Sequence, residues 1–78
     1  MGKPREAFDE VILRSEVAVG SRLVFDTKQP PQRISTSCVE KVLAQGRSAE
    51  KGAYLEVQTR NTVYTLTHLV QLGTTRWK

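Results

Sequence analysis

Histidine, cysteine and serine are the side chains of this chain that could act as general bases or nucleophiles. The one histidine, His68, follows an alternating run whose register directs it inward beside Leu66, as a packing residue. The one cysteine, Cys38, falls on an apolar strand face without a nearby basic cluster, where a thiol is inert. Ser35 and Ser37 match no nucleophile-elbow pattern. We therefore predict no catalytic residue and no enzyme activity.

The residue patterns that hold metals and cofactors are missing from the sequence. A single cysteine excludes an intrachain disulfide and a multi-cysteine metal site. The sequence has no glycine-rich phosphate loop and no spacing typical of metal ligands. We predict no metal, no cofactor and no small-molecule ligand.

Basic side chains and aromatic rings are the groups that could bind nucleic acid. The net charge is +4, and residues 21–78 carry the basic excess, which suggests an anionic partner. The candidate nucleic-acid-binding residues lie mostly in predicted loops, one turn and the C-terminal tail: Arg22, Lys28, Arg33, Arg47, Lys51, Arg60, Arg76 and Lys78. Tyr54 and Trp77 are the rings that could stack on bases. A merely solvated basic surface is the alternative interpretation.

Three residues could instead contact a protein partner. Tyr54 and Val63 fall near each other on the outward face of a predicted hairpin, so an apolar group should cover them. That cover is either the N-terminal apolar stripe that begins at Phe8 or a second subunit. Trp77, in an otherwise polar tail, either folds back on the domain or anchors a partner. A small domain also buries little surface, so we expect self-association.

The clearest structural element is a β-hairpin at residues 54–67. Two alternating runs flank Arg60-Asn61, which predicts a two-residue turn. The register that follows gives three pairs: Thr59 with Thr62, Val57 with Tyr64, and Leu55 with Leu66. The outward face then holds no basic residue: Tyr54, Glu56, Gln58, Val63, Thr65 and Thr67. Because this face cannot track phosphates, we rank protein binding ahead of nucleic-acid binding.

Other segments predict further strands and one helix. Residues 5–14, which follow Pro4, predict a short helix, with a buried strand as the alternative. Strands are expected at residues 22–27 and 33–38, with Cys38 facing inward. A bulge or kink near Cys38-Val39 would let the second strand bend into another layer, and a one-turn helix is the alternative there. Residues 45–52 predict a polar turn.

Together these elements predict one domain, residues 1–78, with flexible ends at residues 1–3 and 74–78. The expected fold class is mainly β: a small, bent antiparallel sheet or partly open barrel of four to five strands with a short N-terminal helix. The sequence has no signal-peptide core and no apolar run near the roughly 18 residues of a membrane span, so we expect a cytoplasmic protein without a membrane partner.

The expected function is that of a small, non-enzymatic binding or accessory module. Its partner would be another protein or a second copy of the chain. The alternative is a nucleic-acid-binding small β-barrel that uses the basic residues of its loops and tail.

Overall fold

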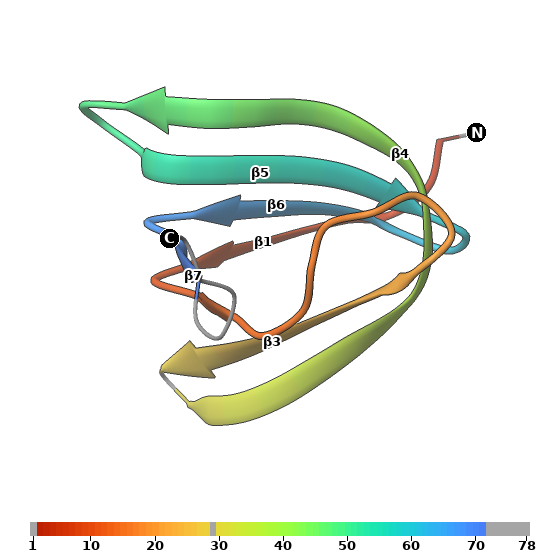
Figure 1. The fold of residues 1–78 in the computed structure, drawn as a ribbon, viewed down its shortest axis with the longest axis horizontal. Coiled ribbons are helices and arrows are strands. Elements are labelled where there is room, and N and C mark those ends of the chain that lie inside the picture. The colour runs from red at the N-terminus through yellow and green to blue at the C-terminus, as the bar shows by residue number, and fades with distance from the viewer. Residues whose placement is uncertain (1, 29, 72–78) are drawn as a thin grey trace.

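Seven strands form one mixed β-sheet in the computed structural model, which describes residues 2–28 and 30–71 (Figure 1). They are β1 (Arg5–Asp9), β2 (Ile12–Leu13), β3 (Arg22–Lys28), β4 (Pro31–Ser48), β5 (Gly52–Thr59), β6 (Val63–Thr67) and β7 (Val70–Gln71). Their order is β1-β6-β5-β4-β3-β2-β7, so β1 and β7 are the edges of an open sheet. The described residues include no helix, and therefore none long and apolar enough to cross a membrane.

The sheet bends because β4 belongs to both of its halves. The first part of β4 pairs with β3 as far as Cys38, and the second part pairs with β5 from Val39 onward. The register with β5 shifts between Val39 and Lys41, which places a bulge where β4 changes partner. Figure 1 shows β4 turning back there, so that both of its ends lie at the left-hand end of the molecule. The predicted bulge near Cys38-Val39 is confirmed.

The predicted hairpin register is also confirmed. Leu55 pairs with Leu66 and Val57 pairs with Tyr64, in antiparallel strands β5 and β6. The amide of Thr59 donates to the carbonyl of Thr62 at 2.8 Å, and this bond closes the Arg60-Asn61 turn. Leu55, Val57 and Leu66 are buried as expected. Alternation and turn chemistry fix this register locally, because a slip of one residue would expose all of these apolar side chains.

The first two strands run side by side with the last two. β1 pairs in parallel with β6, and β2 pairs in parallel with β7. Each residue faces the one 58 positions later, as Asp9 faces Thr67. Between the two pairs both segments kink, at Glu10 (φ 57°) and His68 (φ 48°), which are the non-glycine residues with positive φ in the described chain. Because both kinks occur at the same level, one register continues through β1–β6 and β2–β7.

The predicted N-terminal helix is wrong, and so are the predicted strand number and the all-antiparallel sheet. Residues 5–9 form strand β1, and residues 12–13 form strand β2, so the alternative of a strand describes this segment better. Pairing with β6 satisfies the backbone of β1 and brings the Phe8 ring to 5.3 Å from the Phe25 ring and 6.4 Å from the Tyr64 ring. This distant pairing and burial override the weak local preference for a helix.

The core lies between the two halves of the bent sheet. Its buried members are Val11, Leu13, Leu23, Phe25, Val39, Leu55, Val57 and Leu66. Cys38, predicted to face inward, is exposed, because the register with β3 also shifts between Ser35 and Cys38, where β4 has one residue more than β3. This extra residue exchanges the faces of β4 and directs Val39 into the core instead. Ile34 and Thr36, on the β3 side of this exchange, do face inward.

The polar turn predicted over residues 45–52 is much shorter than expected, because β4 continues to Ser48. Gly46 pairs with Tyr54, and the Tyr54 ring occupies the space above it: a Cβ at Gly46 would lie 2.9 Å from Tyr54 Oη. Gly46 therefore accommodates a cross-strand ring within a strand. The turn itself comes later, at residues 49–51, and Gly52 (φ 63°) follows it as the first residue of β5.

A buried hydroxyl completes the backbone hydrogen bonding of β3. The register between β3 and β4 shifts between Arg22 and Val24, which leaves the amide of Leu23 without a backbone acceptor in β4. The Thr36 hydroxyl accepts this amide at 3.1 Å and donates to the carbonyl of Ser37 at 2.7 Å. Thr36 is 3% exposed, so water cannot replace it as an acceptor.

Replacement of this hydroxyl should destabilise the fold. Thr36→Val keeps the shape but leaves the Leu23 amide unsatisfied, so we expect the free energy of unfolding to fall by about 1–3 kcal/mol in urea titrations. Thr65→Val, on the half-exposed outer face, is the matched control and should change stability by less than about 0.5 kcal/mol. Equal losses for the two variants would contradict this role of Thr36.

Candidate functional site

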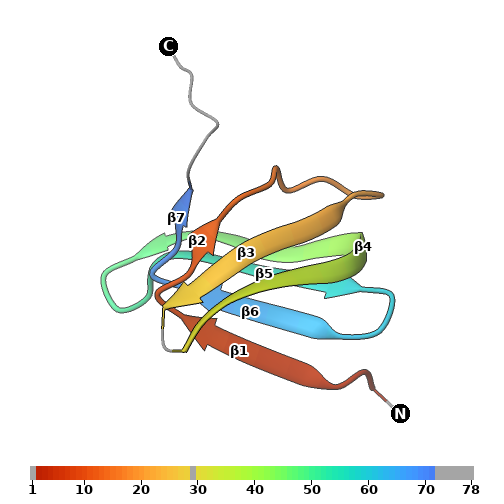
Figure 2. The ribbon, with the colours of Figure 1, turned by 90° about the horizontal axis from the view of Figure 1, so that it is seen from below.

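Strand β1 leaves one side of its backbone unpaired. The Pro4 carbonyl accepts the Val63 amide and the Glu10 amide donates to the Thr67 carbonyl, so the alternate residues Pro4 to Glu10 direct their polar groups toward β6. The intervening residues Arg5, Ala7 and Asp9 direct their N–H and C=O groups away from it. We call these six groups the free edge of β1. Figure 2 shows β1 as the outermost strand on its side of the molecule.

A hollow lies beside this free edge. It has a volume of about 310 Å³ and is lined by residues of β1, of the following kink and of the end of β3: Ala7, Phe8, Asp9, Glu10, Thr27 and Lys28. The hollow exists because β1 and β3 diverge: β2, after the kink, pairs with β3 only at Asp26 and Phe25. An extended segment added to β1 would therefore have room for a side chain on its inner face.

Asp9 links the free edge to the kink. Its Oδ1 atom accepts from the Thr67 hydroxyl at 2.8 Å and lies 2.6 Å from His68 Nδ1. The bond to His68 lowers the pKa of Asp9 below its ordinary value of 3.8. The same bond raises the pKa of His68 above its ordinary value of 6.5. Between pH 3.8 and 6.5 the Asp9–His68 pair is therefore a surface ion pair that ties the end of β1 to the kink after β6.

The sequence-based placement of His68 on the inner face is wrong. The chain turns at His68 through a left-handed conformation, and its amide donates to the Lys51 carbonyl. The ring consequently leaves the register of β6, and about half of the side-chain surface is exposed. Its ring also packs against Gly52, where an added Cβ would lie 2.9 Å from His68 Cδ2.

Two further chemistries find no support among the described residues. The hydrogen bonds of residues 2–28 and 30–71 join His68 to no serine or cysteine side chain, which a nucleophile activated by this ring would need. The same residues contain no group of three or more histidine, cysteine, aspartate or glutamate side chains placed to hold a metal ion. Asp9 and His68 are better explained as a structural link.

Two of the predicted partner-binding residues lie on the outer face of the β4–β5–β6–β1 region. Val63 is 7% exposed, and its neighbours in register are Gln58 on β5 and Arg5 on β1, so these side chains flank it in place of the expected apolar stripe. Tyr54 is half-buried over Gly46, and the Lys51 ammonium lies 5.4 Å from its ring centroid. Trp77 lies outside the described residues. Neither Tyr54 nor Val63 therefore requires a second subunit as cover.

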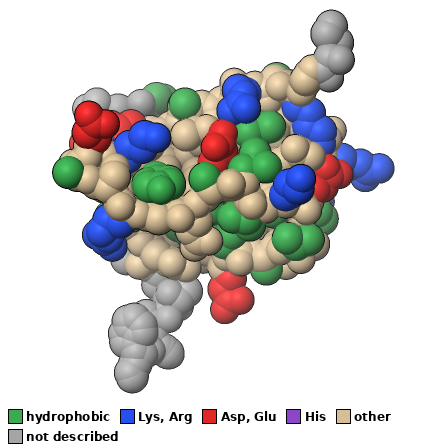
Figure 3. All heavy atoms as spheres, turned by 90° about the horizontal axis from the view of Figure 1, so that it is seen from above, with side chains coloured by type: hydrophobic (Ala, Val, Ile, Leu, Met, Phe, Trp, Pro, Cys, Tyr) green, Lys and Arg blue, Asp and Glu red, His purple; other side chains and the backbone are tan. Residues whose placement is uncertain are grey.

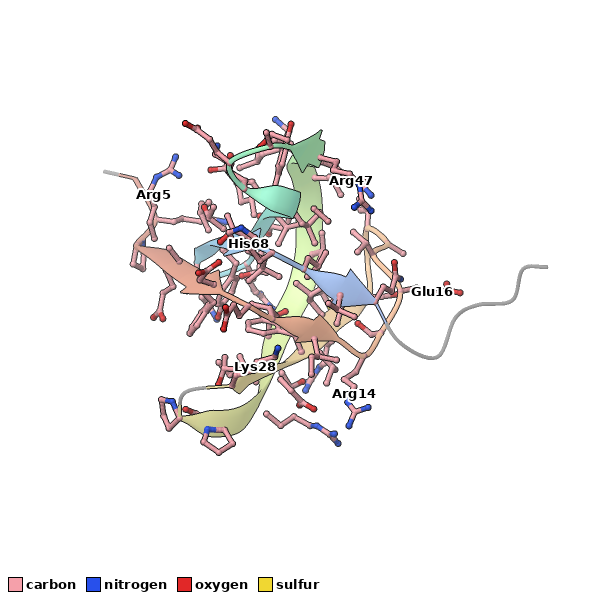
Figure 4. The ribbon with its side chains drawn as sticks, turned by 90° about the vertical axis from the view of Figure 1, so that its left-hand side faces the viewer. Arg5, Arg14, Glu16, Lys28, Arg47 and His68 are labelled. Atoms are coloured by element: carbon pink, nitrogen blue, oxygen red, sulfur yellow. The ribbon has the colours of Figure 1, made fainter. Side chains whose placement is uncertain are left out.

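The predicted nucleic-acid-binding residues do not converge on one patch. Lys28, Arg33, Arg47 and Lys51 lie toward the left-hand end in Figure 1, whereas Arg22 starts β3 and Arg60 forms the hairpin turn at the opposite end. Figure 4 views the molecule from the left-hand side of Figure 1; Lys28 and His68 lie near the middle of this view, and Arg5, Arg14 and Arg47 lie toward three different edges of it. On the face in Figure 3, neutral surface separates the basic side chains. Arg76 and Lys78 lie outside the described residues.

An acid offsets the basic residues at the β3–β4 end. A second hollow, about 570 Å³ in volume, is lined by Ile12, Asp26, Thr27, Lys28, Pro31, Gln32 and Arg33. Asp26 accepts from Arg33 Nε and Arg14 Nε, both at 2.9 Å. The bond from Arg33 lowers the pKa of Asp26 below its ordinary value, so the carboxylate stays charged and offsets the two guanidinium groups. Lys28 is the remaining cation of this hollow.

The residues of the free edge were missed as candidates in the sequence. Arg5, Ala7 and Asp9 stand at alternate positions, which is the signal of a strand, but the same segment also predicts an amphipathic helix. Only the strand order shows that these three residues share an unpaired side.

The Asp9–His68 pair should make stability depend on pH in a defined window. Because folding raises the pKa of His68, the pair stabilises the fold below pH 6.5, and this contribution is lost as the pH rises through the raised value. Because folding lowers the pKa of Asp9, the contribution is present above pH 3.8 and is lost as the pH falls through the lowered value.

His68→Asn tests this window, because asparagine tolerates the positive φ but does not titrate. Urea unfolding from pH 3 to 9 should show the largest stability difference from the native chain between pH 3.8 and 6.5. A difference that stays constant over the whole range would contradict the ion pair.

No family model matches the chain, and no curated protein or solved structure shows significant similarity to it.

Proposed function

We propose that the chain is a small, non-enzymatic protein-binding module that adds an extended partner segment to the free edge of β1. The observation that carries the proposal is the position of β1 at the end of the strand order. The alternate residues Arg5, Ala7 and Asp9 present three N–H donors and three C=O acceptors in the spacing of a strand ladder. Strand addition uses such a row for affinity and neighbouring hollows for specificity.

The hollow beside β1 supports this mode of binding. Side chains of an added strand alternate between the two faces of the sheet. Those on the inner face would enter the hollow, where the Phe8 ring offers apolar contact and Lys28 offers a positive charge. Those on the outer face would lie beside Arg5, Ala7 and Asp9. A bound segment could therefore pair its backbone with β1 and place a side chain in the hollow at the same site.

Nucleic-acid binding has less support. Six of the candidate basic residues lie in the described part of the chain. Arg22 and Arg60 are at the opposite end of the molecule's long axis from the other four. Arg33, which lines the larger hollow, is already paired with Asp26. A continuous basic surface, on which phosphate contacts depend, is not formed by the described residues.

A proline at position 7 should abolish strand addition without breaking the sheet. Ala7→Pro removes one donor of the free edge, whereas the bonds to β6 come from the alternate residues Pro4, Glu6, Phe8 and Glu10. Random ten-residue segments displayed on phage would be selected on the native chain and then assayed on the variants. We expect at least tenfold weaker binding to Ala7→Pro and unchanged binding to Ala7→Thr, which keeps the amide.

Two outcomes would overturn the proposal. If the selected segments bind Ala7→Pro as well as the native chain, or if no segment is selected, the free edge is not the docking site. Amide NMR spectra of both variants would show that β1 remains paired with β6.

A further inference from the structure

The free edge of β1 is complementary to itself. Its three residues carry a positive, a small neutral and a negative side chain in that order: Arg5, Ala7 and Asp9. We infer that the segment bound by β1 is the β1 strand of a second copy, antiparallel to the first, with the two-fold axis at Ala7. This inference rests on the proposed function and names the partner for the same edge.

The backbone of the two strands fits this arrangement. With Ala7 opposite Ala7 of the second copy, Arg5 of each copy lies opposite Asp9 of the other. These are the residues whose polar groups point to the free side, so each of the three facing pairs exchanges two hydrogen bonds. A register moved by two residues would place Arg5 opposite Ala7 and leave Asp9 without a strand partner. The two-fold register is therefore the one that uses the whole edge.

The side chains on the outer face reinforce the same register. Directly opposite residues of an antiparallel pair have their Cβ atoms about 5 Å apart, within reach of an arginine–aspartate ion pair. Arg5 uses Nη1 for Glu56 at 2.8 Å, which leaves its other nitrogen donors available. Asp9 uses Oδ1 for both Thr67 and His68, which leaves Oδ2 available. Two intermolecular ion pairs can form without loss of the intramolecular ones.

The inner face is complementary as well. Glu6 of the second copy lies opposite Phe8 in this register, beside the hollow that Lys28 lines. Glu6 is exposed, and the ion pairs of the described residues include neither Glu6 nor Lys28. Its carboxylate would thus meet an ammonium group across the interface. The small side chain of Ala7 at the axis keeps the two chains free of obstruction on the outer face.

Edge strands that avoid pairing carry charges that repel a second copy. The charges of β1 do the opposite, because antiparallel pairing brings unlike charges together at both ends of the contact. A closed two-fold pair uses the free edge of β1 in both copies, so association through this edge would stop at the dimer.

Charge reversals in two separate chains test the register. Arg5→Asp places two aspartates opposite each other at both ends of its homodimer, and Asp9→Arg places two arginines there. We expect each variant alone to be monomeric in sedimentation velocity. An equimolar mixture restores unlike charges at every position, so it should associate as the native chain does, with a heterodimer detectable by native mass spectrometry. Arg60→Asp, at the hairpin turn, carries the same charge change and should dimerise normally.

The inferred dimer is overturned if the native chain stays monomeric up to about 1 mM, the concentration at which a 1 mM Kd would show substantial dimer. It is also overturned if the single variants dimerise like the native chain, or if their mixture stays monomeric while the native chain dimerises. A monomeric native chain whose selected segments still depend on Ala7 would leave strand addition intact and reject only the second copy as partner.

Discussion

Parallel pairing of the first two strands with the last two, β1 with β6 and β2 with β7, is the constraint on which the bent sheet depends. It joins residues 58 positions apart and keeps one register through two strand pairs. The register survives only because both segments kink at the same level, where Glu10 and His68 adopt positive φ. The Asp9–His68 pair lies at that level and fastens one segment to the other. Core burial of Val11 and Leu13 follows directly, since both residues come after the kink.

Local rules predicted the parts of this fold that neighbouring residues determine. The hairpin at residues 54–67 and the bulge near Cys38-Val39 follow from alternation and from its interruption, and both are present. The N-terminal segment could not be predicted in this way, because its conformation depends on β6, which comes much later in the sequence. Residues 5–9 carry a weak helical pattern, and pairing with β6 outweighs it.

The candidate site was harder to predict than the fold, for a related physical reason. A strand lies at the edge of a sheet when no other strand pairs with one of its sides. The alternation within Arg5–Asp9 does not show whether such a partner strand is present. His68 shows the same limitation on a smaller scale. Its position in the alternating run directs it inward, but one left-handed residue takes the ring out of the register and to the surface. The topology, which the composition of the sequence does not reveal, decides which side chains meet.

The long separation between β1 and β6 has a consequence for how the fold is reached. Pairing of residues so far apart requires closure of a large loop, which makes topologies of this kind slow to form. During synthesis β1 leaves the ribosome well before β6 exists, so both of its sides stay unpaired until most of the chain has been made. The backbone of β1 thus stays unpaired for longer than that of the hairpin β5–β6, whose two strands are made one after the other.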